Sequence, residues 1–145
     1  IWGGTLDDIH HTLNVGVRSE NPETRFSQMP AFGKDQLLTA AEISDLTEYV
    51  VALSGRKANA NAVARATPVF AAQCVACHGA EGKGDPLQGA PNLTDAVWLY
   101  GGDRATLTET ITKARFGVMP AWTGKLSEDE IRAVAVYVHS LGGGE

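Results

Sequence analysis

The sequence is poor in cysteine and methionine, with two of each among its 145 residues, and it has no long apolar run. No stretch approaches the roughly 20 consecutive apolar residues that a membrane-spanning helix needs. The net charge of −5 argues against a nucleic-acid partner, since binding phosphates requires many Lys and Arg side chains. The chain begins with Ile1 and shows no signal peptide, so we expect a processed or excised piece of a longer parent. Any membrane anchor of that parent would lie outside this sequence.

Strand patterns are also lacking, because no segment alternates apolar and polar residues over a useful length. Apolar residues recur instead at helical spacing, for example at Leu6, Ile9 and Leu13, and later at Ile131, Val134 and Val138. Glycine and proline are concentrated between residues 79 and 91, which predicts a loop there. The sequence therefore predicts an all-α protein with short helices and long glycine-rich loops.

The two cysteines stand in the pentapeptide Cys74-Val-Ala-Cys77-His78. This C-x-x-C-H spacing is that of c-type haem attachment. Two thiols three positions apart on a helical turn can each form a thioether to one haem vinyl group. The following histidine then supplies an axial nitrogen to the iron, which gives Cys74 and Cys77 as anchors and His78 as the proximal ligand.

Other interpretations of this motif remain open at this stage. A zinc site would have to recruit distant histidines, because no further cysteine exists. A thioredoxin-like redox pair is expected in a βαβ setting, and the sequence shows no such setting. The pair could also be two buried thiols without a cofactor.

An internal near-repeat of about 90 residues organises the rest of the chain. The segment Met29-Pro-Ala-Phe32 recurs as Met119-Pro-Ala-Trp122. Each copy is followed by a capping box that opens a helix, in residues 39–43 and 127–131. The remaining matches pair Tyr49 with Tyr137, Leu53 with Leu141, and Trp2-Gly-Gly4 with the Trp98-Leu-Tyr-Gly-Gly102 segment.

The repeat predicts three parts of the chain. Residues 1–54 are the C-terminal half of a first domain, residues 55–62 a linker, and residues 63–145 a complete second domain. In the second domain we expect a first helix over 63–77 that starts or restarts near Pro68, and a helix over 106–115 ended by Gly117. The last helix should bury one apolar stripe, formed by Ile131, Val134, Val138 and Leu141. Phe70 and Tyr137 should meet where the first and last of these helices cross.

The half-domain over residues 1–54 should carry an apolar stripe on its last helix, formed by Ile43, Leu46, Val50 and Leu53. Exposure of such a stripe is unfavourable, because burial of each side chain is worth about 1.5–3 kcal/mol. The stripe would pack on the second domain, on another copy of the chain, or on an upstream segment, and we favour the last.

Met119 is the predicted distal ligand, because both methionines of the chain stand in the same Met-Pro-Ala-aromatic setting. The alternative is that Met119 is an ordinary core residue. His139 is the competing ligand, although its place on the last helix indicates a surface residue, and His10 and His11 are also expected on the surface. Met29 would bind iron only if another segment supplied a first haem.

A ligating imidazole needs an acceptor for its second N–H group, and the Pro91 carbonyl is a candidate. Trp98, Tyr100 and Arg115 are candidates for holding the haem propionates. Ordinary packing, or a solvated charge in the case of Arg115, explains these three residues equally well.

Taken together, these residues resemble the c-type cytochrome family: C-x-x-C-H, then Pro-Asn-Leu, Met-Pro and a closing helix. The segments Gly89-Ala-Pro-Asn-Leu-Thr-Asp95 and Trp98-Leu-Tyr-Gly-Gly102, with the doubled Met-Pro-Ala, are similar to the dihaem subunit III of cbb3-type cytochrome c oxidases. The resemblance covers nearly all of the chain.

This resemblance implies a class I cytochrome c-like domain with one covalent haem c, preceded by half of a second such domain. It implies electron transfer from a cytochrome donor to the catalytic oxidase subunit, on the periplasmic side of a bacterial inner membrane, with no catalysis by this subunit alone. The expected partners are the donor cytochrome and the catalytic and monohaem subunits of the oxidase. The alternatives are a stand-alone periplasmic cytochrome, and a haem enzyme or gas sensor with a dissociable methionine. A third is an interaction module that docks or self-associates through residues 1–54.

Overall fold

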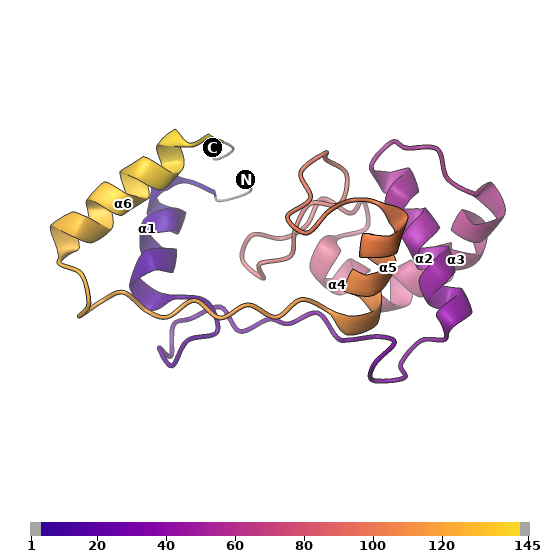
Figure 1. The fold of residues 1–145 in the computed structure, drawn as a ribbon, viewed down its shortest axis with the longest axis horizontal. Helices are drawn as coiled ribbons and strands as arrows, with labels where there is room; N and C mark the ends of the chain where they lie inside the picture. The colour runs from indigo at the N-terminus through magenta and orange to yellow at the C-terminus, as the bar shows by residue number, and fades with distance from the viewer. Residues whose placement is uncertain (1–3, 143–145) are drawn as a thin grey trace. The chain divides into compact units, whose positions relative to one another are not determined.

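The computed structural model describes residues 4–142, and these residues fold into helices joined by loops (Figure 1). Residues 4–142 contain no strand beyond isolated β-bridges, which confirms the predicted all-α fold. Within the same range, no helix combines the length and apolarity needed to cross a bilayer. The helices are α1 (Leu6–Val15), α2 (Ala40–Leu53), α3 (Ala60–Gln73), α4 (Val75–His78), α5 (Arg104–Lys113) and α6 (Glu128–Ser140).

The helices belong to two compact units, and each unit combines segments of both sequence repeats. Among the described residues, unit 1 consists of 4–27, 86–89 and 116–142, and unit 2 of 28–85 and 90–115. The units therefore do not coincide with the contiguous divisions predicted at residues 54 and 63. The Trp2-Gly-Gly4 match of the repeat starts outside the described residues.

Unit 2 is built around α2, which packs against both α3 and α5 (Figure 1). Thr39 and Glu42 form the predicted capping box at the start of α2. The predicted stripe is buried, with Leu46 1% exposed and Leu53 partly buried against the same core. The stripe on residues 1–54 is thus covered within this chain, which removes the reason to expect self-association through it.

Helix α3 begins earlier than the sequence predicted. Asn59 caps it by accepting backbone N–H bonds from Asn61 and Ala62, so the linker ends before residue 62. The helix also runs through Pro68 without restarting there. Pro68 and Ala64 lie on the exposed side, where water can satisfy the carbonyl that proline leaves without a partner.

Helix α5 runs over Arg104–Lys113, whereas the sequence predicted a helix over 106–115 that Gly117 ends. Ala114 takes a positive φ of 60° at the C-cap, and its N–H donates to the Thr110 carbonyl. The chain leaves the helix at this residue, before it reaches the glycine. Leu107 and Ile111 are buried on one face of α5, as predicted.

The predicted contact between Phe70 and Tyr137 is wrong. Phe70 on α3 instead stacks with Tyr49 of α2, with ring centroids 4.6 Å apart. Tyr137 on α6 is 64% exposed. The repeat explains this outcome. Tyr49 and Tyr137 occupy equivalent positions on α2 and α6, which are the closing helices of the first and second repeats. It is α2 that packs on α3.

Unit 1 is formed mainly by α1 and α6, which lie side by side (Figure 1). Its core consists of Ile9 and Leu13 from α1 with Ile131 and Ala135 from α6. The predicted stripe on α6 is only partly right. Ile131 is buried and Val134 and Val138 pack against the core, but Leu141 follows the last turn and is 58% exposed.

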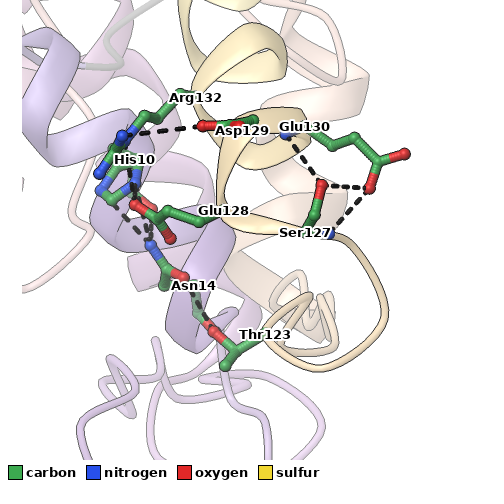
Figure 2. A network of polar contacts seen from close by, with 8 residues as sticks. All are labelled: His10, Asn14, Thr123, Ser127, Glu128, Asp129, Glu130 and Arg132. Carbon is green, nitrogen blue, oxygen red and sulfur yellow. Dashed lines mark hydrogen bonds and ion pairs between the residues drawn. The ribbon is translucent and has the colours of Figure 1, made fainter.

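Polar contacts between α1 and α6 surround this small core (Figure 2). The Nε2 atom of His10 lies 3.0 Å from Oε1 of Glu128, and Arg132 reaches the same oxygen at 3.1 Å. The Oγ1 hydroxyl of Thr123 donates to the side-chain oxygen of Asn14 at 2.8 Å. His10 is therefore half-buried in an interface and not a plain surface residue, whereas His11 is exposed as predicted.

Candidate functional site

The C-x-x-C-H motif forms a single helical turn in unit 2. Helix α3 ends at Gln73, Cys74 caps the next turn, and α4 carries the motif to His78. The backbone N–H groups of Cys77 and His78 both donate to the Cys74 carbonyl, at 3.2 and 2.9 Å. This turn gives the two thiols and the imidazole the helical spacing that the motif predicted.

The His78 ring is held by the Pro91 carbonyl, with 3.0 Å between Nδ1 and the oxygen. This is the contact expected from the sequence. A carbonyl can only accept, so Nδ1 carries the proton and Nε2 keeps its lone pair for a metal. Burial lowers the pKa of His78, although the bond to Pro91 opposes this, and the imidazole is thereby favoured in its neutral form.

The loop over residues 79–93 brings Pro91 back to His78. The N–H of Gly84 donates to the His78 carbonyl at 2.8 Å, and Asp85 and Ala90 exchange backbone bonds that close the loop. Gly84 has a φ of +80°, and a Cβ atom there would stand 2.4 Å from the Ala90 carbonyl oxygen. Only glycine fits this position without moving the backbone next to Pro91.

Both cysteines are thiols and both are half-buried. Burial raises the pKa of Cys74 to about 11, with a smaller contribution from the neighbouring Cys77 thiol. A thiol with a raised pKa is a poor spontaneous nucleophile, in contrast to the lowered pKa of a redox-active C-x-x-C pair. The thioredoxin-like interpretation also expects a βαβ setting, and residues 4–142 contain no strand beyond isolated β-bridges.

The three candidates for holding propionates all lie in unit 2, and two of them are in contact. The guanidinium carbon of Arg115 stands 4.7 Å from the centre of the Tyr100 ring. Trp98 instead contacts Arg56, whose guanidinium carbon lies 5.7 Å from the centre of the Trp98 ring. Arg56 also donates to the Gly102 carbonyl. Sequence reasoning placed Arg56 in the linker, and no local pattern could have assigned it to Trp98.

The two methionines fall in different units. Met119, the predicted distal ligand, lies in unit 1 and packs against the core of α1 and α6. Met29 lies in unit 2 and packs against the core that Cys74 and Val75 also contact. His139, the competing ligand, is half-buried on α6 in unit 1.

The donor set of unit 2 fits a covalently bound haem. It supplies two thiols, an imidazole oriented for ligation through Nε2, and half-buried aromatic and apolar groups around them. It does not fit zinc, because no three His, Cys, Asp or Glu side chains in residues 4–142 cluster to hold a metal ion. A helical fold with a C-x-x-C-H turn, and with a backbone carbonyl bound to the second nitrogen of its histidine, defines a c-type cytochrome domain.

Comparison with known proteins gives a narrower assignment. A family model described as "Cytochrome C oxidase, cbb3-type, subunit III" matches residues 61–138. The chain is 55% identical to the cbb3-type cytochrome c oxidase subunit CcoP of Cereibacter sphaeroides. It is 57% identical to subunit FixP of Bradyrhizobium sp. and 52% identical to subunit FixP of Bradyrhizobium diazoefficiens. Each alignment covers 100% of this chain and 50% of the relative.

The chain belongs to the family of cbb3-type cytochrome c oxidase subunit III. The resemblance stated from the sequence is thereby confirmed. The chain spans about half the length of the curated relatives it matches. Membership implies a cytochrome c-type domain and hence haem c.

Proposed function

We propose that this chain is an electron-transfer cytochrome c that relays electrons from a cytochrome donor to the catalytic subunit of a cbb3-type terminal oxidase. The observation that carries the proposal is the bond from His78 Nδ1 to the Pro91 carbonyl, which leaves Nε2 to bind iron. The names of the relatives support the oxidase as partner, since they are subunits of cbb3-type cytochrome c oxidases.

The residues of unit 2 would hold one haem c per chain. Cys74 and Cys77 provide the thioether anchors, and His78 provides the proximal ligand. A methionine thioether would be the second ligand, for which the sequence predicts Met119. When bound, the haem supplies a reversible one-electron couple, and a thioether ligand raises its potential. With His78 and a methionine both bound to it, the iron would have no position left for a substrate, which favours a carrier over an enzyme.

We propose that two contacting pairs, Arg115 with Tyr100 and Arg56 with Trp98, receive the acidic propionates of such a haem. A guanidinium can bind a carboxylate with two parallel hydrogen bonds. The parent protein would present this domain on the periplasmic side of a bacterial inner membrane, where its donor and the oxidase core would meet it.

The haem count tests the cofactor directly. The purified haem-loaded chain should keep its haem in acidic acetone, and a pyridine haemochrome assay should give close to one haem per chain. Extraction of the haem, or a count near two, would overturn the assignment.

Electron transfer is tested by mixing the reduced chain with an oxidised cbb3 oxidase core that lacks its own subunit III. We expect oxidation of the chain and reduction of the core in equal amounts. A chain that instead binds carbon monoxide rapidly in the ferrous state would have an open axial position, and would support the gas-sensor alternative.

A further inference from the structure

A cavity of about 220 Å³ opens in unit 1, and no residue assigned to the haem lines it. Its walls come from the loop after α1 and from the tip of the loop over residues 79–93. Two of the lining side chains are positively charged and none is acidic, although the chain as a whole has a net charge of −5. The lining residues are Val17, Arg18, Arg25, Ser27, Gln88 and Gly89.

The local fold brings the two arginines together at one end of the loop after α1. Gly16 ends this helix with a φ of 73°, which turns the chain away from the helix axis. The backbone N–H of Arg18 donates to the Arg25 carbonyl at 3.0 Å, and the Thr24 hydroxyl donates to the Gly16 carbonyl at 3.2 Å. The loop therefore closes at Arg18 and Arg25, and both side chains line the same cavity.

The guanidinium of Arg18 is held by neutral groups within residues 4–142. Its terminal nitrogens donate to the Gly117 and Ser27 carbonyls, each at 2.8 Å, and its central carbon lies 5.0 Å from the centre of the Phe116 ring. Its Nε atom is buried and has no hydrogen-bond partner in the same range. A positive charge that is partly withdrawn from water and has no counter-ion is stabilised by a nearby anion.

Arg25 is half-buried and also has no carboxylate partner among the described residues. Its Nη1 atom donates to the Thr12 hydroxyl at 3.2 Å. The ion pairs within residues 4–142 include Arg65 with Asp45 and Arg104 with Glu48, but neither Arg18 nor Arg25. A guanidinium has five N–H donors, so both of these arginines keep donors for a ligand.

We propose that this cavity binds a phosphate group. The oxygens of phosphate are arranged tetrahedrally, so they can accept charge-assisted hydrogen bonds from guanidinium groups on two walls at once. The Ser27 hydroxyl donates to the Gln88 carbonyl, which fixes the tip of the 79–93 loop beside the two arginines. The cavity is also several times larger than the volume of about 30 Å³ that one water molecule occupies in the liquid.

The phosphate group can be free, or it can belong to the headgroup of an anionic phospholipid. Two large apolar side chains next to the lining residues are strongly exposed, Phe26 at 72% and Leu87 at 81%. Apolar side chains beside a cationic site suit an amphiphile with an anionic head. A lipid source requires the membrane setting of the proposed function, whereas binding of free phosphate does not.

The test is isothermal titration calorimetry with inorganic phosphate on the haem-loaded chain, in low-salt Tris buffer at neutral pH. We expect one site per chain, and we expect Arg25→Gln to weaken binding by about tenfold or more, because it removes a charged donor. Arg18→Lys keeps the charge but loses the forked donors, and should also weaken binding. Lys125→Gln is the matched control, because it changes the net charge as Arg25→Gln does on an exposed side chain outside the cavity, and it should bind as the parent chain does.

Vesicle sedimentation distinguishes the two sources of phosphate. For a lipid headgroup, the parent chain should bind vesicles that contain phosphatidylglycerol more strongly than vesicles of phosphatidylcholine alone, and both Arg25→Gln and Phe26→Ser should reduce this binding. For free phosphate, calorimetry should detect the site and the vesicles should not distinguish the parent from Arg25→Gln.

Two results would overturn the proposal. One is the absence of both phosphate binding and Arg25-dependent vesicle binding in the parent chain. The other is an equal effect of Arg25→Gln and Lys125→Gln, which would show attraction by net charge and not a site. Circular dichroism shows whether each variant is folded, and the haem count of the variants separates this test from that of the proposed function.

Discussion

Tyr49 and Phe70 stack with ring centroids 4.6 Å apart and an angle of 27° between their planes. Tyr49 comes from the closing helix of the first repeat, and Phe70 lies on α3 four residues before Cys74. The contact therefore ties the first repeat to the helix that leads into the C-x-x-C-H turn. It replaces the contact between Phe70 and Tyr137 that we expected where the first and last helices of the second domain cross.

Replacing the two equivalent tyrosines should give unequal effects. We expect Tyr49→Ala to lower the free energy of unfolding by about 2–3 kcal/mol, because it removes a half-buried ring and its stacking contact. The matched control Tyr137→Ala should change the free energy by less than about 0.5 kcal/mol, as a surface substitution. Urea unfolding of the haem-loaded chain measures both values. A larger loss for Tyr137→Ala would show that α6 packs on α3.

Acid should loosen the attachment of α2. The hydrogen bonds from Arg65 lower the pKa of Asp45 below its ordinary value of 3.8. Those from Arg104 and from the Asn59 amide lower the pKa of Glu48 below 4.5. A carboxyl whose pKa is lower in the folded state stabilises the fold above its unfolded-state pKa, and this contribution is lost as the pH falls through the folded pKa.

We therefore expect the melting temperature of the chain to decline as the pH drops below these ordinary carboxyl values. The double variant Asp45→Asn/Glu48→Gln should melt lower than the parent at neutral pH and show a shallower acid decline. The variant Glu20→Gln/Glu23→Gln, with the same change in net charge, is the control and should keep the parent profile. Far-ultraviolet circular dichroism follows the melting. Identical acid profiles for the parent and the Asp45/Glu48 variant would contradict the prediction.

In the loop that holds Pro91 against His78, a methyl group added at Gly84 should lower the free energy of unfolding more than one added at Gly89. Gly84 and Gly89 both have positive φ, but an added Cβ meets the Ala90 carbonyl only at Gly84 and finds open space at Gly89. We expect Gly84→Ala to cost about 1–3 kcal/mol more than Gly89→Ala, because the backbone next to Pro91 must shift. Urea unfolding measures the difference, and equal costs would show that the loop adapts without strain.

His78 and His139 should differ as ligands. In His78→Ala we expect a haem that stays attached through Cys74 and Cys77 but loses its low-spin spectrum, because its axial nitrogen is gone. His139→Ala should leave the spectrum of the parent chain, because we expect a methionine thioether, and not this imidazole, as the second ligand. Optical and electron paramagnetic resonance spectra of the ferric state make the comparison. A changed spectrum in His139→Ala would revive it as the competing ligand.

Short-range features could be predicted from the sequence because the groups that form them are close along the chain. The capping boxes at Thr39 and Ser127 join residues three positions apart, and the C-x-x-C-H turn closes through backbone bonds within four residues. The contact between His78 and Pro91 joins residues 13 positions apart, and proline and the family pattern pointed to it. The all-α class followed from helical periodicity alone.

Only the tertiary structure decided that α2 packs in unit 2 and α6 in unit 1. The apolar stripes of α2 and α6 are nearly interchangeable, with Ile43 matching Ile131 and Val50 matching Val138. Hydrophobic burial is non-directional, so such stripes do not specify a partner. The distinction lies in polar pairs between helices, such as Asp45 with Arg65 and Glu48 with Arg104, which are 20 and 56 residues apart. No periodicity in the sequence joins residues at those separations, and only the folded chain brings the carboxylates and the guanidinium groups together.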